Sequence, residues 1–211
     1  MQENPTLFSY IVTDDVGFAP NPYFGVCTLA ACKPQIRARA QEGDIVIGLG
    51  SKELGHPFVY AMLVEEVLGF DVYYHDERYQ RKKPDLDSQD LTRIEGDNFY
   101  QPLPGEGYLQ MRSVHSGWDG TEDLKKKVTD LSGKHVLTSR TYYYYGESGQ
   151  PIPDEIAFLK VGRGHKSRFD YPEIMAVLSY LEALSPGVQG APRDSQKELR
   201  RLSRLAAQAR R

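Results

Sequence analysis

GDIVIGLGSK, residues 43–52, is followed closely by the apolar run FVYAMLVEEVL, residues 58–68. Gly43 and Asp44 are typical of a turn, and residues 45–48 are typical of a buried strand. The longer run predicts a second strand that bends near Glu65. Two such strands close together in the chain indicate a sheet at the centre of the fold.

Other segments extend this α+β pattern on both sides. Strands are predicted at residues 6–12, 108–112 and 135–139, and the four tyrosines at 142–145 should alternate, two on each face of a strand. Residues 71–104 are polar and predict a long loop over the core. Residues 121–128 predict a short helix. Asp170 and Glu173 form a capping box that predicts a helix start.

The C-terminal end has a different composition. Residues 193–211 contain seven basic residues and two acidic ones. Ser195 and Glu198 form a second capping box before an apolar stripe flanked by arginines, which predicts a basic amphipathic helix. We therefore expect one α+β domain at residues 1–185, and a linker with this helix at residues 186–211. The helix is a candidate surface for a protein partner.

Composition excludes several classes of protein. The chain has 211 residues, a formal net charge of -3 and two cysteines. It has no apolar run long enough for a membrane span, we expect no signal peptide, and its cysteine content does not suggest a disulfide scaffold. We expect a cytoplasmic protein without membrane contact. Nucleic acid, if bound, should meet local basic patches, because the whole chain is not a polycation.

Two basic motifs are candidates for contact with a nucleic-acid backbone. RYQRKKP, residues 78–84, interleaves cations with a ring, and GRGHKSR, residues 162–168, combines cations with glycines whose amides suit an anion. The second motif is neither a Walker A loop nor a dinucleotide fingerprint. The predicted backbone contacts are Lys33, Arg78, Arg81, Lys82, Lys83, Arg163, Gly164, His165 and Lys166.

A second set of residues suits a nucleobase. The loop GFAPNPYFG, residues 17–25, places aromatic rings beside an amide, as a pocket for an extruded base requires. The predicted base pocket consists of Phe18, Asn21, Tyr23, Thr28, Asp97, Asn98, His115 and Ser116. His115 and Asp97 are the catalytic candidates, because an imidazole exchanges protons near neutral pH and a carboxylate can assist it. Rings that only fill the core are the alternative explanation.

The sequence lacks the signatures of several cofactors and mechanisms. Cys27 and Cys32 have no second pair, and the five histidines show no metal-binding spacing. The zinc deaminase signature and the Gly-x-Ser-x-Gly motif are absent. We therefore predict no metal and no cofactor.

Two resemblances add to this reading. The GDIVIGLGSK strand with FDVYYHD, residues 70–76, resembles the PUA-like superfamily, specifically its EVE and YTH branch. This resemblance implies a β-barrel, here with insertions and C-terminal helices, whose pocket takes a flipped base. The motifs between residues 6 and 166 together resemble the second family of nucleotide-modification-associated domains. Those domains occur in bacteria and phages beside genes for DNA base modification.

The sequence therefore supports three hypotheses. The first is recognition of a modified or flipped nucleobase in nucleic acid, with DNA the preferred partner. The second is an enzyme of DNA base modification or modified-base removal. The third is a partner in a modification complex that binds a small nucleotide. Sequence does not distinguish them.

Overall fold

The computed structural model describes residues 5–117 and 119–195. In chain order its strands are β1 (Leu7–Ile11), β2 (Cys27–Leu29), β3 (Ile45–Leu49), β4 (Phe58–Leu63), β5 (Glu66–Gly69), β6 (Tyr100–Pro102), β7 (Tyr108–Gln110), β8 (His135–Ser139), β9 (Tyr142–Tyr144), β10 (His165–Lys166) and β11 (Gly187–Val188). The α-helices are α1 (Pro34–Arg37), α2 (Phe70–His75), α3 (Leu91–Ile94), α4 (Leu124–Leu131) and α5 (Tyr171–Glu182). The 3-10 helices are η1 (Lys52–Leu54), η2 (Glu77–Lys82), η3 (Gly146–Ser148) and η4 (Asp154–Leu159).

A six-stranded mixed sheet forms the centre, in the order β10-β1-β3-β4-β9-β11. β3 pairs in parallel with β1 and antiparallel with β4. Both faces of β3 are buried, because Ile45 and Ile47 face one apolar cluster while Val46 faces another. The continuous apolar run in the sequence reflects this burial on two sides.

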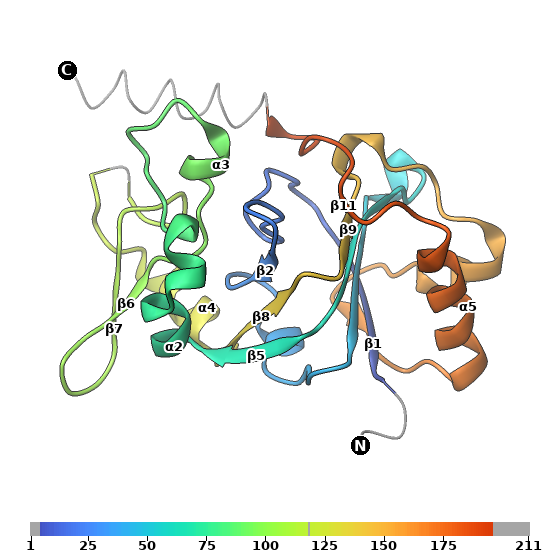
Figure 1. The fold of residues 1–211 in the computed structure, drawn as a ribbon, viewed down its shortest axis with the longest axis horizontal. Coiled ribbons are helices and arrows are strands. Elements are labelled where there is room, and N and C mark those ends of the chain that lie inside the picture. Colours follow the sequence, from blue (N-terminus) through green and yellow to red (C-terminus); the bar gives the residue numbers. More distant parts are fainter. Residues whose placement is uncertain (1–4, 118, 196–211) are drawn as a thin grey trace.

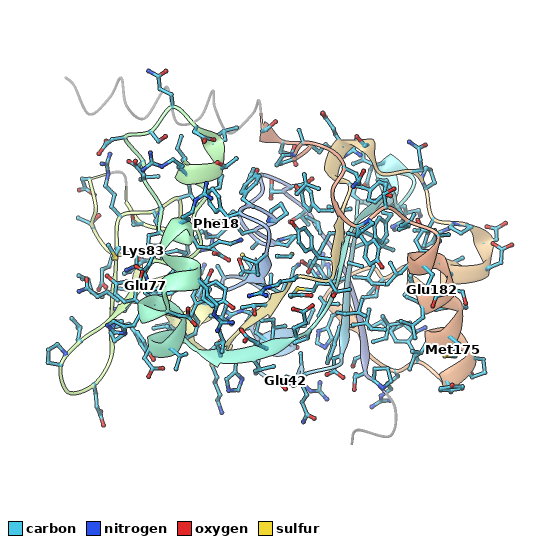
Figure 2. All side chains as sticks on the ribbon, viewed as in Figure 1. Phe18, Glu42, Glu77, Lys83, Met175 and Glu182 are labelled. Atoms are coloured by element: carbon cyan, nitrogen blue, oxygen red, sulfur yellow. The ribbon has the colours of Figure 1, made fainter. Side chains whose placement is uncertain are left out.

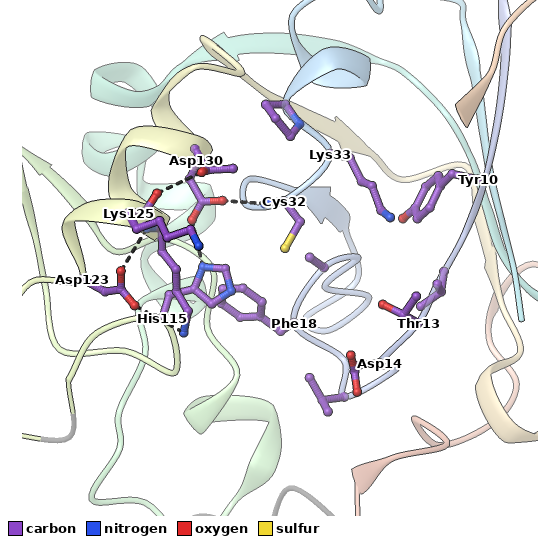
Figure 3. Close-up of a pocket in the computed structure, with 16 residues that line it drawn as sticks. Tyr10, Thr13, Asp14, Phe18, Cys32, Lys33, His115, Asp123, Lys125 and Asp130 are labelled. Carbon is purple, nitrogen blue, oxygen red and sulfur yellow. Dashed lines mark hydrogen bonds and ion pairs between the residues drawn. The ribbon is translucent and has the colours of Figure 1, made fainter. Parts of the chain in front are cut away.

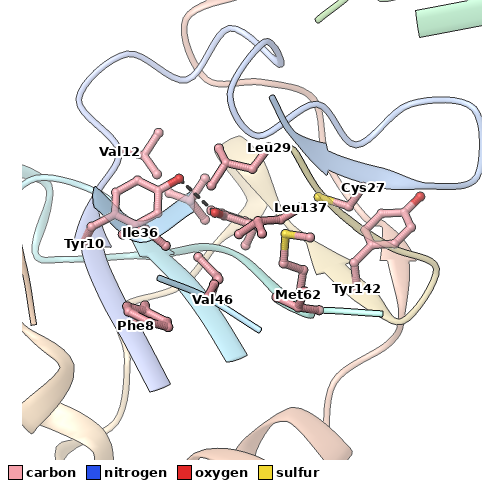
Figure 4. Close-up of a cluster of buried hydrophobic side chains, with 14 of the residues drawn as sticks. Phe8, Tyr10, Val12, Cys27, Leu29, Ile36, Val46, Met62, Leu137 and Tyr142 are labelled. Atoms are coloured by element: carbon pink, nitrogen blue, oxygen red, sulfur yellow. Dashed lines mark hydrogen bonds between the residues drawn. The ribbon is translucent and has the colours of Figure 1, made fainter. Parts of the chain in front are cut away.

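The molecule is built in layers on either side of that sheet (Figure 1). α5 covers one face, where Val177 and Leu181 pack against the β3 isoleucines. A three-stranded sheet, β2-β8-β5, lies against the other face. Leu29 and Leu137 of that sheet meet the side chains of β1 and β4, and Figure 4 shows this cluster. Side chains fill the space between the layers throughout (Figure 2).

A third apolar cluster lies on the far side of the smaller sheet. It joins Val136 of β8 to α2, η2 and β6, and its members are mostly aromatic: Phe18, Phe70, Tyr73, Tyr79, Phe99 and Tyr100. The predicted loop at residues 71–104 is therefore wrong. Its rings are buried against β8, and this burial orders the segment into α2, η2, α3 and β6.

The predicted α+β class is confirmed, but no closed barrel is found. The described strands form separate sheets of six, three and two strands. The bend predicted near Glu65 is confirmed, but the run at residues 58–68 forms two strands, β4 and β5, where one was predicted. The carboxylate of Glu65 accepts the backbone N–H groups of Arg140 and Thr141, each at 2.9 Å, where the chain leaves the large sheet and enters the smaller one as β5.

Alternation of the four tyrosines is confirmed. Tyr142 and Tyr144 belong to the cluster between the two sheets, whereas Tyr143 and Tyr145 pack on the α5 side. The inner pair anchors the loop after β1. The Tyr144 hydroxyl donates to Asp15 Oδ1 at 2.6 Å, and the Tyr142 hydroxyl donates to the Pro22 carbonyl at 3.0 Å.

The segment expected to be a linker contributes to the fold. β11 extends the large sheet in parallel with β9, and the backbone N–H of Asp194 donates to the carbonyl of Asp15 at 2.8 Å. Most of the predicted basic helix, including Glu198 of its capping box, lies outside the described residues. No helix within residues 5–117 and 119–195 is long and apolar enough to cross a membrane.

The capping box of α5 is confirmed and gives a direct test of the fold. Asp170 accepts the backbone N–H of Glu173 at 2.9 Å, and the Glu173 side chain accepts that of Asp170 at 3.0 Å. Asp170→Ala should lower the free energy of unfolding by about 1 kcal/mol in urea denaturation, because an orphan N–H loses its acceptor. Asp154→Ala, at an exposed position with no such bond, is the control; an equal loss there would contradict the assignment.

Candidate functional site

A cavity of about 600 Å³ opens between the end of β1, the loop that follows it, and α4 (Figure 3). Its described lining combines rings, cations, carboxylates and one thiol. Among the residues that form it are Tyr10, Thr13, Asp14, Phe18, Cys32, Lys33, His115, Asp123, Lys125, Lys126, Thr129 and Asp130. This mixture of apolar walls and a few convergent polar groups is typical of a small-molecule site.

His115 is held at one wall of the cavity by three contacts. Its Nδ1 lies 2.8 Å from Asp130 Oδ2, and its ring packs against Phe18 with centroids 4.5 Å apart. Phe99 touches the ring from another side, at a centroid distance of 6.0 Å. The imidazole is therefore fixed in orientation, and its other nitrogen is left toward the cavity.

Asp130 is a buried carboxylate with several donors. Burial acts to raise its pKa, but hydrogen bonds from His115, from the Cys32 amide and from the Tyr100 hydroxyl outweigh burial and hold the pKa below its ordinary value. An ionised carboxylate only accepts hydrogen bonds, so His115 Nδ1 must carry the proton. In a neutral imidazole the lone pair is then on Nε2, which makes His115 a proton acceptor on the cavity side.

The segment of Cys32 and Lys33 has an unusual backbone. Both residues adopt left-handed φ angles, 57° and 39°, although neither is glycine. Such angles persist when the surroundings over-determine them, and they concentrate at functional sites. Two hydrogen bonds hold this segment in place. Cys32 N donates to Asp130 Oδ1 at 2.7 Å, and the Lys33 ammonium donates to the Ile11 carbonyl at 3.1 Å.

A second cavity of about 450 Å³ adjoins the first. The two share Thr13, Lys33 and Pro34, so that Lys33 stands between them. Arg163, Gly164 and His165 of the GRGHKSR motif line the second cavity. Burial, followed by the charges of Arg39 and Lys33, lowers the pKa of His165. The cations and the glycine-rich backbone of this cavity suit an anion.

Only part of the predicted base pocket comes together. Phe18 and His115 line the cavity, but six other predicted members do not: Asn21, Tyr23, Thr28, Asp97, Asn98 and Ser116. Asn98 is buried and donates to the carbonyls of Tyr73 and Tyr79. Ser116 closes its own turn by donating to the Ser113 and Gly117 carbonyls.

Four of the predicted residues instead form a buried polar network. The Lys82 ammonium donates to Asn21 Oδ1 at 2.6 Å and to the carbonyls of Asn21 and Val26 at 2.9 and 2.7 Å. Asp97 accepts from Thr28 at 2.7 Å and from Tyr73 at 2.6 Å. Lys82 and Asp97 are 0% and 1% exposed, so the structure makes them internal supports of the loop after β1 and leaves them out of reach of a nucleic-acid backbone.

The other cations predicted to contact a nucleic-acid backbone differ in how far other protein groups already engage them. Arg78 is engaged by Glu66 at 2.8 Å and by Asp76 at 2.7 Å. Lys166 turns to the Phe158 carbonyl and the Phe169 ring. Arg81 and Lys83 line a separate cavity of about 490 Å³, where the Arg81 guanidinium lies 4.3 Å from the centroid of the Phe24 ring.

Most of the residues that line the cavity were not identified from sequence, among them Tyr10, Cys32 and Asp130. Cys32 and Asp130 stand 98 positions apart, and no local motif marks either one. A pair so distant becomes visible only when β1, α1 and α4 meet. Within residues 5–117 and 119–195, no group of three or more His, Cys, Asp or Glu side chains is arranged to hold a metal ion.

Comparison with known families identifies the family to which the chain belongs. The profile of the family described as nucleotide modification associated domain 2 matches residues 4–199. The match covers almost the entire chain, and the protein belongs to this family. No curated protein and no solved structure matches it. The resemblance drawn from its motifs is thereby confirmed, whereas the PUA-like segment gains no support.

The Asp130 carboxylate should make stability depend on acid. A depressed folded-state pKa stabilises the native state above the ordinary value of 3.8, and this contribution is lost as pH falls through the folded-state value. Asp130→Asn should be less stable than the wild type at neutral pH, with a difference that shrinks below pH 3.8. Urea denaturation across a pH series measures it. Asp154→Asn, at an exposed position, is the control, and a difference independent of pH would contradict the assignment.

Two neighbouring lysines, Lys82 and Lys83, test whether Lys82 is a buried support of the polar network. Burial lowers the pKa of Lys82 to about 8, although the charge of Asp97 opposes the change. Lys82→Met should destabilise the protein by about 3–5 kcal/mol, because it leaves a buried carboxylate uncompensated. Lys83→Met should cost less than about 1 kcal/mol, since it removes only a contact with the Tyr74 ring. Equal losses in chemical denaturation would show that Lys82 is not a buried support.

Proposed function

We propose that this domain recognises a modified or flipped nucleobase in nucleic acid, in association with DNA base modification. The observation that supports this most strongly is the pair of adjoining cavities that share Lys33. One has aromatic walls with fixed hydrogen-bonding groups, and the other is lined by cations and glycine-rich backbone. A nucleotide has the same division into a planar base and an anionic phosphate.

The first cavity provides what an extruded base needs. The His115 ring, with Phe18 packed against it, forms an aromatic wall, and the Asp130 carboxylate fixes the histidine so that Nε2 accepts a hydrogen bond. Asp14, Thr13 and Lys33 line other parts of the wall. Base stacking on an aromatic ring contributes about 1–3 kcal/mol per base.

The second cavity suits the phosphate of the same nucleotide. Arg163 is exposed, so that its guanidinium can reach an anion without the cost of burying an isolated charge. Gly164 has φ 77°, and a Cβ built there would meet nothing within 4 Å, so the backbone is open to close approach. Lys33 reaches this cavity as well, which makes the phosphate subsite doubly cationic.

The separate cavity lined by Arg81 and Lys83 supports a nucleic-acid strand, rather than a single nucleotide, as the binding partner. Phe24 follows Phe18 in the same loop, and its ring lies under the Arg81 guanidinium beside Lys83 and Arg93. Rings interleaved with cations suit single-stranded nucleic acid. The alternative, a domain that binds a free nucleotide as part of a modification complex, is favoured by the closeness of the first two cavities, which together match one nucleotide.

Binding of labelled single-stranded DNA tests this proposal. The oligonucleotides carry an unpaired plain or modified pyrimidine, and anisotropy is measured at two salt concentrations. Phe18→Ala should weaken binding by about 1–3 kcal/mol. Arg163→Ala should weaken binding and reduce the salt dependence by about one ion contact. Arg168→Ala, which removes a charge from the same motif outside both cavities, is the matched control.

Each outcome of this experiment decides between specific alternatives. Binding that Phe18→Ala and Arg163→Ala leave unchanged, while Arg168→Ala weakens it, would overturn the assignment of the two cavities. Competition by a mononucleotide at equal affinity would favour the free-nucleotide alternative. Loss of affinity when the strand is shortened would favour the strand, since only a strand reaches Arg81 and Lys83.

A further inference from the structure

We propose that the cavity is catalytic and that the Cys32 thiol adds to carbon 6 of a pyrimidine nucleotide, with His115 as the base. This inference rests on the proposed function, because it requires the nucleotide to lie with its base in the first cavity and its phosphate in the second. It goes further in assigning a reaction and in restricting the base to a pyrimidine.

One carboxylate positions both reacting groups. Asp130 accepts the backbone N–H of Cys32 through Oδ1 at 2.7 Å and holds His115 Nδ1 through Oδ2 at 2.8 Å. The thiol and the imidazole line the same cavity, and Figure 3 shows both side chains at its wall. A thiol and a base that is oriented by a third group are the parts of a thiol-dependent enzyme, and the reaction requires the thiol to come within hydrogen-bond reach of that base.

The thiol depends on that base. Burial raises the pKa of Cys32 to about 11, with the Asp130 charge in the same direction and the charges of Lys33, Arg37 and Lys126 in opposition. The sulfur therefore rests as a protonated thiol and needs an acceptor for its proton. Among the described residues no hydrogen bond joins Cys32 to His115, and pairs of this kind are often looser before substrate binds.

The position of Cys32 selects the atom that it can attack. Cys32 lines the first cavity and directly precedes Lys33, one of the three residues that the two cavities share, so we infer that the thiol faces the end of the base cavity nearest the phosphate subsite. In a pyrimidine nucleotide, carbon 6 is the ring atom on the side of the sugar and the 5′-phosphate. Carbon 6 is also electrophilic, because the double bond to carbon 5 is conjugated with the carbonyl at carbon 4 of uracil or the amidine of cytosine.

The step is balanced without any further reagent. The thiol proton moves to His115 Nε2, the sulfur forms a bond to carbon 6, and the electron pair of the carbon 5–carbon 6 double bond moves toward carbon 5. Carbon 5 then takes a proton from solvent. In reversal, carbon 5 loses its original hydrogen, the carbon–sulfur bond breaks and the thiol regains its proton. The net result is exchange of the hydrogen on carbon 5.

Exchange in deuterium oxide is the test. The full chain is incubated with deoxyuridine monophosphate, deoxycytidine monophosphate and an oligonucleotide that contains one unpaired cytosine, and proton NMR follows the hydrogen on carbon 5. We expect the wild type to exchange it, Cys32→Ala and His115→Asn to lose exchange, and Ser132→Ala, at an exposed position after α4, to retain it. Asp130→Asn should slow exchange, because it removes the carboxylate that holds both the Cys32 backbone and the His115 ring.

Alkylation of the wild-type protein supplies a measurement that needs no variant. Cys27 is fully buried, so iodoacetamide should modify Cys32 selectively, bound nucleotide should protect it, and the modified protein should lose exchange. Tight binding of the same nucleotides without exchange would overturn this inference and leave the proposed function intact. Absence of binding would overturn both. Exchange that survives in Cys32→Ala would show that another group reacts.

Discussion

The buried contact between Arg37 and the α4–β8 turn is the constraint on which the site depends. The Arg37 guanidinium donates to the carbonyls of Cys32 and His135 at 2.8 and 2.7 Å and to the carbonyl of Asp130. Its side chain is 0% exposed, and burial lowers its pKa to about 10. Gly133 makes this possible, because a Cβ there would lie 2.5 Å from the guanidinium carbon. One cation thus joins the segment around Cys32 and α1 to the α4–β8 turn, which is more than 90 residues away in sequence.

The position of the cavity follows from that junction. Arg37 fixes the carbonyl of Cys32, while Asp130 fixes its N–H, so the left-handed backbone at this point is held from both sides. The same carboxylate orients His115. A buried charge with all its partners in place is costly to disturb, because removing one partner leaves the others unpaired in a low dielectric. The site is therefore rigid where its polar groups converge, and more open toward Arg163 and Gly164.

Sequence predicted the local elements well and their assembly poorly. Residues 45–49 and 135–139 showed their strands through apolar periodicity, and Asp170 with Glu173 showed the start of α5 through capping chemistry. These signals are local. The aromatic residues of 71–104 were not recognised as core, because polar neighbours hide an apolar set that becomes contiguous only after folding. The sequence indicated a bend near Glu65 but not that β5 joins a second sheet, since the backbone partners of Glu65 lie 75 and 76 positions away.

The candidate site shows the same limit in chemical terms. Phe18, His115, Lys33 and Arg163 were predicted because rings and cations suit a nucleotide, and the structure places them at the two adjoining cavities. Asp97 and Lys82 were misleading because the same side-chain types also stabilise an interior, and only burial distinguishes the two uses. Asp130 was missed for the opposite reason, because within a lysine-rich helix its carboxylate resembles a solvated surface charge. Its function is set by donors from Cys32, Tyr100 and His115, and sequence alone does not bring those three donors to one carboxylate.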